Sequence, residues 1–250
     1  MRRIVYGVRP VEEALRARRV HALFIVEGQE DDARGPMKGV LEAAKLVGVS
    51  ATPRAKAALD ALAKGGVHQG VLAVTGEYPY ASIEQILAAG TRSDGTPPLV
   101  LVLDGLQDPQ NFGALVRTAH VVGVDGIVIA RDRQVGVTPA VVKASAGATE
   151  HARIALVTNV ARSLEELKRA GLWICGAVAQ EGEPPWKIDM KVPLALVLGA
   201  EGRGIRPLVL RGCDLLVRIP MIGQVASLNV GAAGAMLLYE AARQRADRGQ

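Results

Sequence analysis

Residues 194–245 read LALVLGAEGRGIRPLVLRGCDLLVRIPMIGQVASLNVGAAGAMLLYEAARQR. The stretch holds two short apolar runs, 194–198 and 215–219, and each is followed by a turn. The first turn, 199–204, is rich in glycine, and the second begins with Pro220-Met221. Such runs are typical of buried parallel strands that end at the edge of their sheet. Ligands of open α/β sheets bind at this edge, so the stretch predicts a cofactor pocket built from backbone loops.

The composition indicates a globular protein with a large aliphatic core. Of 250 residues, 49% are hydrophobic and 3% are aromatic, and the mean hydropathy is +0.20. No apolar run is long enough to span a bilayer, and the first residues lack the features of a signal peptide, which predicts a cytoplasmic location and no membrane partner. Cys175 and Cys213 are far apart, with no Cys-x-x-Cys pair and no histidine cluster, so we expect neither a disulfide framework nor a metal site.

The charge fits a polyanionic partner without requiring one. The net charge is +5 and the isoelectric point is about 9.4. The low aromatic content argues against recognition of single strands by a broad stacking platform. Six arginines crowd the start of the chain, and they either contact phosphates or form a solvated face; they are Arg2, Arg3, Arg9, Arg16, Arg18 and Arg19.

Composition and the order of expected helices and strands divide the chain into a first domain (1–76), a linker (77–97) and a second domain (98–250). The first domain alternates short helices and strands and predicts a small α/β unit; the helices are expected at 11–17, 36–47 and 56–63, and the strands at 22–26 and 71–74. The linker is rich in Gly, Ser, Thr, Asp and Pro, around a short helix at 82–88. The second domain alternates strand and helix throughout, which predicts a mainly parallel sheet with helices on both faces.

Three loops of the second domain carry candidate functional residues. The first is 108–113, where Asn111 is expected to cap the following helix and Arg117 lies off its buried stripe. An arginine beside the space left by Gly113 can grip a phosphate or a carboxylate with two hydrogen bonds. Taken alone, however, an exposed arginine on a helix is more often only a surface residue.

The second and third loops lie in the closing stretch. Residues 199–204 match neither the Walker A pattern nor the Rossmann fingerprint, and they place the carboxylate of Glu201 among glycines. An ordinary strand-to-helix turn is the plainer interpretation of this loop. In the third loop, Ser227 is the expected N-cap of the last helix and Asn229 the next polar residue. The N-terminus of that helix suits a carboxylate or a phosphate.

Together these loops resemble the three motifs of the SpoU (TrmH-like) RNA ribose methyltransferases of the SPOUT superfamily. The matching residues are DPQNFGALVRTA (108–119), LGAEGRG (198–204), and IPM (219–221) followed by SLNV (227–230). The first domain also resembles the small RNA-binding domain of the rRNA branch, which is similar to a ribosomal protein. The residues that carry this likeness are Tyr6-Gly7, PVEEAL (10–15) and HQGV (68–71). Among family members, the resemblance is nearest to 23S rRNA (guanosine-2′-O)-methyltransferases of the RlmB type.

The resemblance implies S-adenosylmethionine (SAM) as methyl donor, a deep C-terminal trefoil knot, a homodimer, an RNA substrate and no metal or DNA. It implies that the polar active-site residues are Asn111, Arg117, Glu201, Ser227 and Asn229. It implies that the cofactor-binding positions are Gly199, Ala200, Glu201, Gly204, Ile219, Met221, Ser227 and Leu228. One position departs from the family pattern, because Gly231 stands where a small hydroxyl residue is common. We expect a local packing difference there and no loss of activity.

Three other functions compete with rRNA methylation. The same chemistry could act on tRNA, or the chain could be an RNA-binding or ribosome-assembly protein whose methylation site has decayed. The polar active-site residues that the resemblance implies are all present in the sequence, which argues against a decayed methylation site. A generic nucleotide-binding protein comes last, because both common phosphate-loop patterns are absent.

Overall fold

The computed structural model describes residues 2–29, 35–91, 93, 95–224 and 227–246. Its contacts divide the chain into two compact units. The first comprises Met1–Pro79 with Val137–His151, and the second comprises Tyr80–Gly136 with Ala152–Gln250. Within the described ranges, no helix is long and apolar enough to cross a membrane.

The first unit is built on a four-stranded sheet with the strand order β1-β4-β2-β3. Only β2 and β3 are parallel neighbours; the other two pairings are antiparallel. The elements in chain order are β1 (Arg3–Tyr6), α1 (Val8–Arg16), β2 (Val20–Val26), α2 (Lys38–Val47), β3 (Ala51–Arg54), α3 (Lys56–Ala63), β4 (Val71–Thr75), α6 (Pro139–Ala144) and the 3₁₀ helix η1 (Ala148–Glu150). Strands β1 and β3 are not among the strands predicted from the sequence. Strand β3 is a sheet edge whose last three residues are exposed, so it lacks an apolar pattern.

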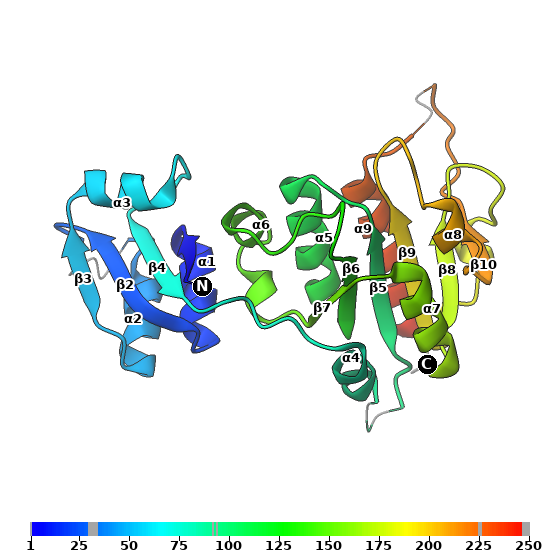
Figure 1. Ribbon diagram of the computed structural model, residues 1–250, viewed down its shortest axis with the longest axis horizontal. Coiled ribbons are helices and arrows are strands. Elements are labelled where there is room, and N and C mark those ends of the chain that lie inside the picture. The colour runs from blue at the N-terminus through cyan, green and yellow to red at the C-terminus, as the bar shows by residue number, and fades with distance from the viewer. Residues whose placement is uncertain (1, 30–34, 92, 94, 225–226, 247–250) are drawn as a thin grey trace. The chain divides into compact units, whose positions relative to one another are not determined.

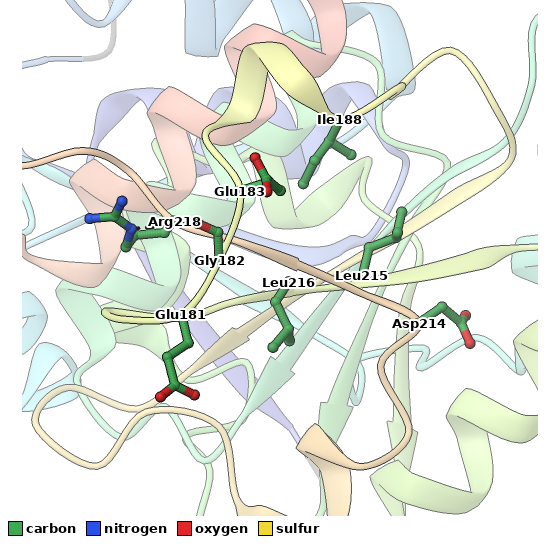
Figure 2. Close-up of a pocket in the computed structure, with 8 residues that line it drawn as sticks. All are labelled: Glu181, Gly182, Glu183, Ile188, Asp214, Leu215, Leu216 and Arg218. Atoms are coloured by element: carbon green, nitrogen blue, oxygen red, sulfur yellow. Dashed lines mark hydrogen bonds between the residues drawn. The ribbon is translucent and has the colours of Figure 1, made fainter.

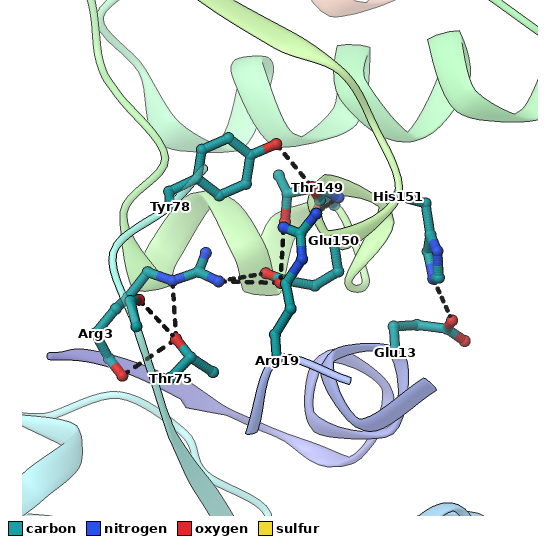
Figure 3. Close-up of polar contacts among 10 residues, drawn as sticks. Arg3, Glu13, Arg19, Thr75, Tyr78, Thr149, Glu150 and His151 are labelled. Carbon is teal, nitrogen blue, oxygen red and sulfur yellow. Dashed lines mark hydrogen bonds and ion pairs between the residues drawn. The ribbon is translucent and has the colours of Figure 1, made fainter. Parts of the chain in front are cut away.

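Residues 137–151 pack in the first unit, although the sequence analysis assigns them to the second domain. The reason is a buried ion cluster (Figure 3) around Glu150, whose side chain is fully buried. Arg3 donates from Nη2 to both carboxylate oxygens, at 2.9 and 3.0 Å, and Arg19 donates to the second oxygen at 3.3 Å. The Tyr78 hydroxyl donates to the carbonyl of Thr149 at 2.8 Å. A buried carboxylate without its cations would be costly, which ties this segment to the start of the chain.

Most of the arginines in the N-terminal cluster are held in ion pairs within the first unit. Besides Arg3 and Arg19, Arg9 and Arg16 also pair with a buried carboxylate, that of Glu12, at 3.1 and 2.6 Å. Four of the six clustered arginines thus have an acidic partner in the same unit. This arrangement favours the structural interpretation of the cluster over a row of free phosphate contacts.

The second unit is built on a six-stranded sheet with the order β10-β8-β9-β5-β6-β7, shown in Figure 1. Every neighbouring pair is parallel, which confirms the predicted α/β fold and its mainly parallel sheet. The elements in chain order are α4 (Ile83–Gly90), β5 (Leu99–Asp104), α5 (Pro109–Val121), β6 (Gly126–Ala130), β7 (Ile154–Val157), α7 (Val160–Arg169), β8 (Trp173–Ala177), η2 (Pro185–Lys187), β9 (Leu194–Gly199), α8 (Pro207–Leu210), β10 (Leu215–Val217) and α9 (Val230–Ala246).

Helices cover both faces of this sheet. On one face, Val100 and Val102 of β5 belong to a core cluster with residues of α4, α7 and α8. Successive strand residues point to opposite faces, so Leu101 and Leu103 point to the other face, which α5 and α9 cover. Central strands buried on both sides explain the continuous apolar runs that the sequence analysis used to find them.

Helix α9 lies tightly against α5 and β9 because Gly234 has no side chain. A Cβ atom at Gly234 would lie 2.3 Å from Leu115 Cδ2 and 2.7 Å from Leu198 Cδ1. Both leucines are buried. Among the small residues near the start of α9 (Gly231, Ala232, Gly234 and Ala235), Gly234 therefore contributes to packing inside the unit.

We expect Gly234→Ala to lower the free energy of unfolding by about 1–3 kcal/mol, the usual cost of overpacking a core. Helix propensity alone would act in the opposite direction, by about 1 kcal/mol. Chemical denaturation would measure the change. Gly223→Ala is the matched control, because a Cβ there meets no atom within 4 Å. An unfolding free energy for Gly234→Ala equal to or above that of the wild type would contradict this account.

Candidate functional site

Three polar side chains from three distant segments meet in one hydrogen-bonded cluster. Asn111 donates from Nδ2 to Oε1 of Glu201 at 2.8 Å, and Asn229 donates to the same oxygen at 2.7 Å. Asn229 also donates to Oδ1 of Asn111 at 3.0 Å. We name Asn111, Glu201 and Asn229 the polar triad. Because one carboxylate oxygen accepts from both amides, each side chain holds the other two in a defined orientation.

Local helix signals position two members of the triad. Asp108, not Asn111, is the N-cap of α5: its Oδ1 accepts from the amide of Gln110 at 2.6 Å, and Pro109 occupies the first helical position. Asn111 is thus free to turn its side chain towards Glu201. The expected capping role of Asn111 is wrong, because the aspartate three residues earlier takes it.

Helix α9 begins two residues later than the Ser227 cap would place it. Oδ1 of Asn229 accepts from the amides of Gly231 and Ala232, at 2.9 and 3.2 Å, so Asn229 is the capping residue. The prediction that Ser227 caps this helix is wrong. Asn229 caps α9 through its oxygen and binds the other two triad residues through its nitrogen, which uses both ends of the amide.

The glycine-rich segment forms a tight hairpin at the carboxyl end of β9, not a simple strand-to-helix turn. Ala200 and Gly204 exchange two backbone hydrogen bonds, at 3.1 and 2.8 Å, and we name residues 199–204 the glycine hairpin. Gly202 and Gly204 adopt positive φ angles of 74° and 66°, which favour glycine. At position 199 glycine is required for a steric reason, because a Cβ would lie 2.0 Å from the carbonyl carbon of Gly204.

A cavity of about 560 Å³ opens beside this hairpin, at the carboxyl ends of β8 and β9. Volumes of this size are common in small-molecule sites. All eight positions predicted to bind the cofactor line it, together with Asn229 of the triad. Its remaining walls are residues 177–179, Leu198, Gly202, Val217, Val230, Ala233 and Leu237. Residues 177–179 were not predicted to line the site, because nothing in their sequence distinguishes them from the end of any other strand.

Arg117 and Asn111 do not line the cavity. Arg117 is exposed on α5, one turn or more beyond Asn111. Within the part of the chain that the structure describes, Arg117 makes no ion pair or side-chain hydrogen bond. A guanidinium with all its donors available is suited to binding an anion from outside the protein.

A second cavity, of about 420 Å³, lies along the edge strand β10 (Figure 2). Its walls include three acidic residues, Glu181, Glu183 and Asp214. The Asp214 carboxylate is already satisfied by Nζ of Lys168 at 2.6 Å and by the amide of Ile174 at 2.9 Å. None of the predicted site residues lines this cavity, so the larger one is the candidate site.

The pKa values of both cysteine thiols are raised, which favours their protonated form. Burial raises the pKa of Cys175 to about 12, and burial, with the nearby Asp214 carboxylate, raises the pKa of Cys213 to about 11. Protonated thiols are poor nucleophiles and poor metal ligands. Over the described residues, no group of three or more His, Cys, Asp or Glu side chains is arranged to hold a metal ion.

The pattern of the SpoU rRNA Methylase family matches residues 98–239. The chain belongs to the SpoU rRNA Methylase family. A second pattern, for the substrate-binding domain of RNA 2′-O ribose methyltransferases, matches residues 4–81. These two matches confirm the family resemblance drawn from the three motifs and from the first domain.

Relatives of this SpoU family member match it over nearly its whole length. Bacillus subtilis YacO, named for the TrmH family of tRNA/rRNA methyltransferases, is 42% identical over 96% of this chain and 95% of its own. The 23S rRNA (guanosine-2′-O-)-methyltransferase RlmB of Bordetella pertussis is 43% identical over 88% of each chain. Among solved structures, the SpoU methyltransferase AviRb of Streptomyces viridochromogenes, in complex with the cofactor AdoMet, covers 98% of this chain and 91% of its own, with a TM-score of 0.78 and 26% identity.

Proposed function

We propose that this protein transfers a methyl group from SAM to a ribose 2′-hydroxyl of RNA, and that its substrate is a guanosine of 23S rRNA. The observation that carries the proposal is the match of both family patterns, one for the methylase and one for substrate binding, along a single chain. The similarity to RlmB supports 23S rRNA as the substrate. The combined tRNA/rRNA name of YacO keeps tRNA as the second candidate.

The cavity beside the glycine hairpin fits SAM, the cofactor bound in the AviRb structure. Apolar side chains such as Leu198, Val217 and Leu237 suit the faces of an adenine ring, and the hairpin offers backbone groups for its polar edges. When bound, SAM supplies a methyl group on a positively charged sulfur, which is already a good leaving group. The protein therefore has to align the reactants and needs no metal for this step.

The chain's own residues would act on the RNA. Arg117 would clamp the phosphate next to the target ribose and stabilise the negative charge that develops on the 2′-oxygen. A guanidinium stays protonated in proteins, so Arg117 serves as a clamp and not as the proton acceptor. The proton of the 2′-hydroxyl would leave to solvent water as the methyl group is transferred and the neutral thioether departs. The polar triad and Ser227 would orient the ribose. The fixed hydrogen bonds of the triad support this role, because a rigid polar cluster loses little entropy on binding.

A homodimer and a cytoplasmic location complete the proposal. Large apolar side chains are exposed on the neighbouring helices α5 and α9: Val121 is 77%, Met236 51% and Tyr239 66% exposed. Exposed apolar side chains that form a contiguous patch are typical of a protein interface, and we propose that these three contribute to it. Light scattering after size exclusion should give twice the chain mass.

A cytoplasmic location follows from an rRNA substrate. The trefoil knot stays a prediction.

Mapping 2′-O-methyl groups in rRNA and tRNA, with and without the protein, tests the proposal. A single new methyl group at a 23S rRNA guanosine is the expected result. Methylation confined to tRNA would replace the proposed substrate with the second candidate. Absence of SAM binding in calorimetry would favour the non-catalytic RNA-binding function.

A further inference from the structure

The carboxylate of Asp104 is a buried charge at the base of the glycine hairpin. Asp104 is the last residue of β5 and is fully buried. It stands in register opposite Gly199, the last residue of the neighbouring strand β9. Its charge therefore lies at the carboxyl edge of the sheet, where the loops that follow the central strands β5 and β9 begin. The sequence offers one signal for it, a lone acid that ends an otherwise apolar run.

Asp104 binds Arg206, two residues beyond the glycine hairpin, through both its backbone and its side chain. The Arg206 amide donates to Oδ2 at 2.8 Å, and its Nε donates to Oδ1 at 2.7 Å. Nη2 of the guanidinium lies 2.5 Å from the same Oδ1. Three donors on one buried carboxylate compensate its loss of hydration, and removal of the charge would leave them without a full partner.

This ion pair determines where the returning arm of the hairpin lies. The hairpin leaves the sheet at Gly199 and returns across it, so that the amide nitrogen of Ile205 lies 2.1 Å from the position of a Cβ on Gly199. Arg206 follows immediately and is held by Asp104. The two backbone hydrogen bonds between Ala200 and Gly204 close the loop on itself. Ile205 packs its side chain into the core, and the Asp104–Arg206 pair adds polar side-chain contacts that hold the returning arm to the neighbouring strand β5.

We propose that Asp104 is a positioning residue for the cofactor pocket, which acts through Arg206 to hold the glycine hairpin in its binding conformation. Gly199, Ala200 and Gly204 line the cavity, whereas Asp104 and Arg206 do not touch it. The pair thus contributes to cofactor affinity by preorganising the glycine hairpin, and it makes no contact with the cofactor itself. The inference rests on the proposed binding of SAM in this cavity.

The test compares two aspartate-to-asparagine substitutions in the full-length protein. Asp125 is the matched control, because it is also buried, also accepts a backbone amide, from Leu99 at 2.8 Å, and lies at the opposite edge of the same sheet. We expect Asp104→Asn to raise the Kd for SAM by at least about tenfold, equivalent to ~1.4 kcal/mol. The kcat at saturating SAM should change by less than about threefold, as expected when only binding is weakened. Asp125→Asn should leave the Kd unchanged even where it lowers Tm.

The outcomes separate this inference from the proposed function. Wild-type protein that does not bind SAM would overturn the proposed function itself. SAM binding by the wild type and equally by Asp104→Asn would overturn only the positioning role. If Asp104→Asn does not fold, Arg206→Lys replaces it, because the Arg206 side chain is 44% exposed and lysine keeps the charge without the Nε contact. A Kd for Arg206→Lys equal to that of the wild type would count against the inference.

Discussion

Gly199→Ala should abolish SAM binding and is the most damaging single-methyl change that the site offers. The new Cβ would lie 2.0 Å from the carbonyl carbon of Gly204 and 2.1 Å from the amide nitrogen of Ile205. Both are backbone atoms, so no side-chain rotation relieves the overlap. Strand β9 is held between β8 and β5, and the hairpin must therefore open. We expect a loss of affinity of more than about 100-fold, together with a loss of unfolding free energy of about 3 kcal/mol, at the upper end of overpacking costs.

Two other glycines separate steric exclusion from a general effect of the substitution. Gly202→Ala lies in the same hairpin, but its Cβ meets no atom within 4 Å and only the positive φ of 74° opposes it. It should cost about 1 kcal/mol, as expected for a side chain in the left-handed region. Gly223→Ala should have no effect on binding. Calorimetry with SAM measures the affinity and thermal unfolding measures the stability. Retained affinity in Gly199→Ala would refute the close packing of the glycine hairpin against Gly199.

Arg117→Ala should reduce methylation by about 10²–10³-fold in kcat, the range found when one electrostatic contact to a developing oxyanion is removed. Affinity for SAM should be unchanged, because Arg117 does not line the cavity. Stability should also be unchanged, since the side chain is exposed. Single-turnover methylation of rRNA, beside calorimetry with SAM, measures the two effects separately.

Arg169→Ala, an exposed arginine in the last turn of α7, is the control for a general loss of positive charge. It should retain full activity. Arg117→Lys should recover part of the rate, because lysine keeps the charge but cannot make two parallel hydrogen bonds to a phosphate. Full methylation by Arg117→Ala would end the assignment of Arg117.

Elements with a strong local signal were predictable from the sequence. The helix α3 (Lys56–Ala63) has the predicted boundaries, and α4 begins after a capping box formed by Ser82 and Gln85. Strand β3 was missed because an exposed edge strand carries no apolar periodicity. The start of α9 was misplaced because Ser227 and Asn229 are both good caps, and the choice between them depends on a hydrogen-bonding partner far away in the sequence.

The sequence by itself determined the alternation of strand and helix, the parallel sheet and the family, because apolar periodicity and short motifs are local in the chain. Only the tertiary structure decided that Asn111 and Asn229 share one oxygen of Glu201, that Asp104 holds Arg206, and that Glu150 joins the first unit through Arg3. Each of these pairings spans between 28 and 147 residues. A charge or an amide looks the same in the sequence whether it faces solvent or a buried partner, and only the packed sheet brings the partners within hydrogen-bonding distance.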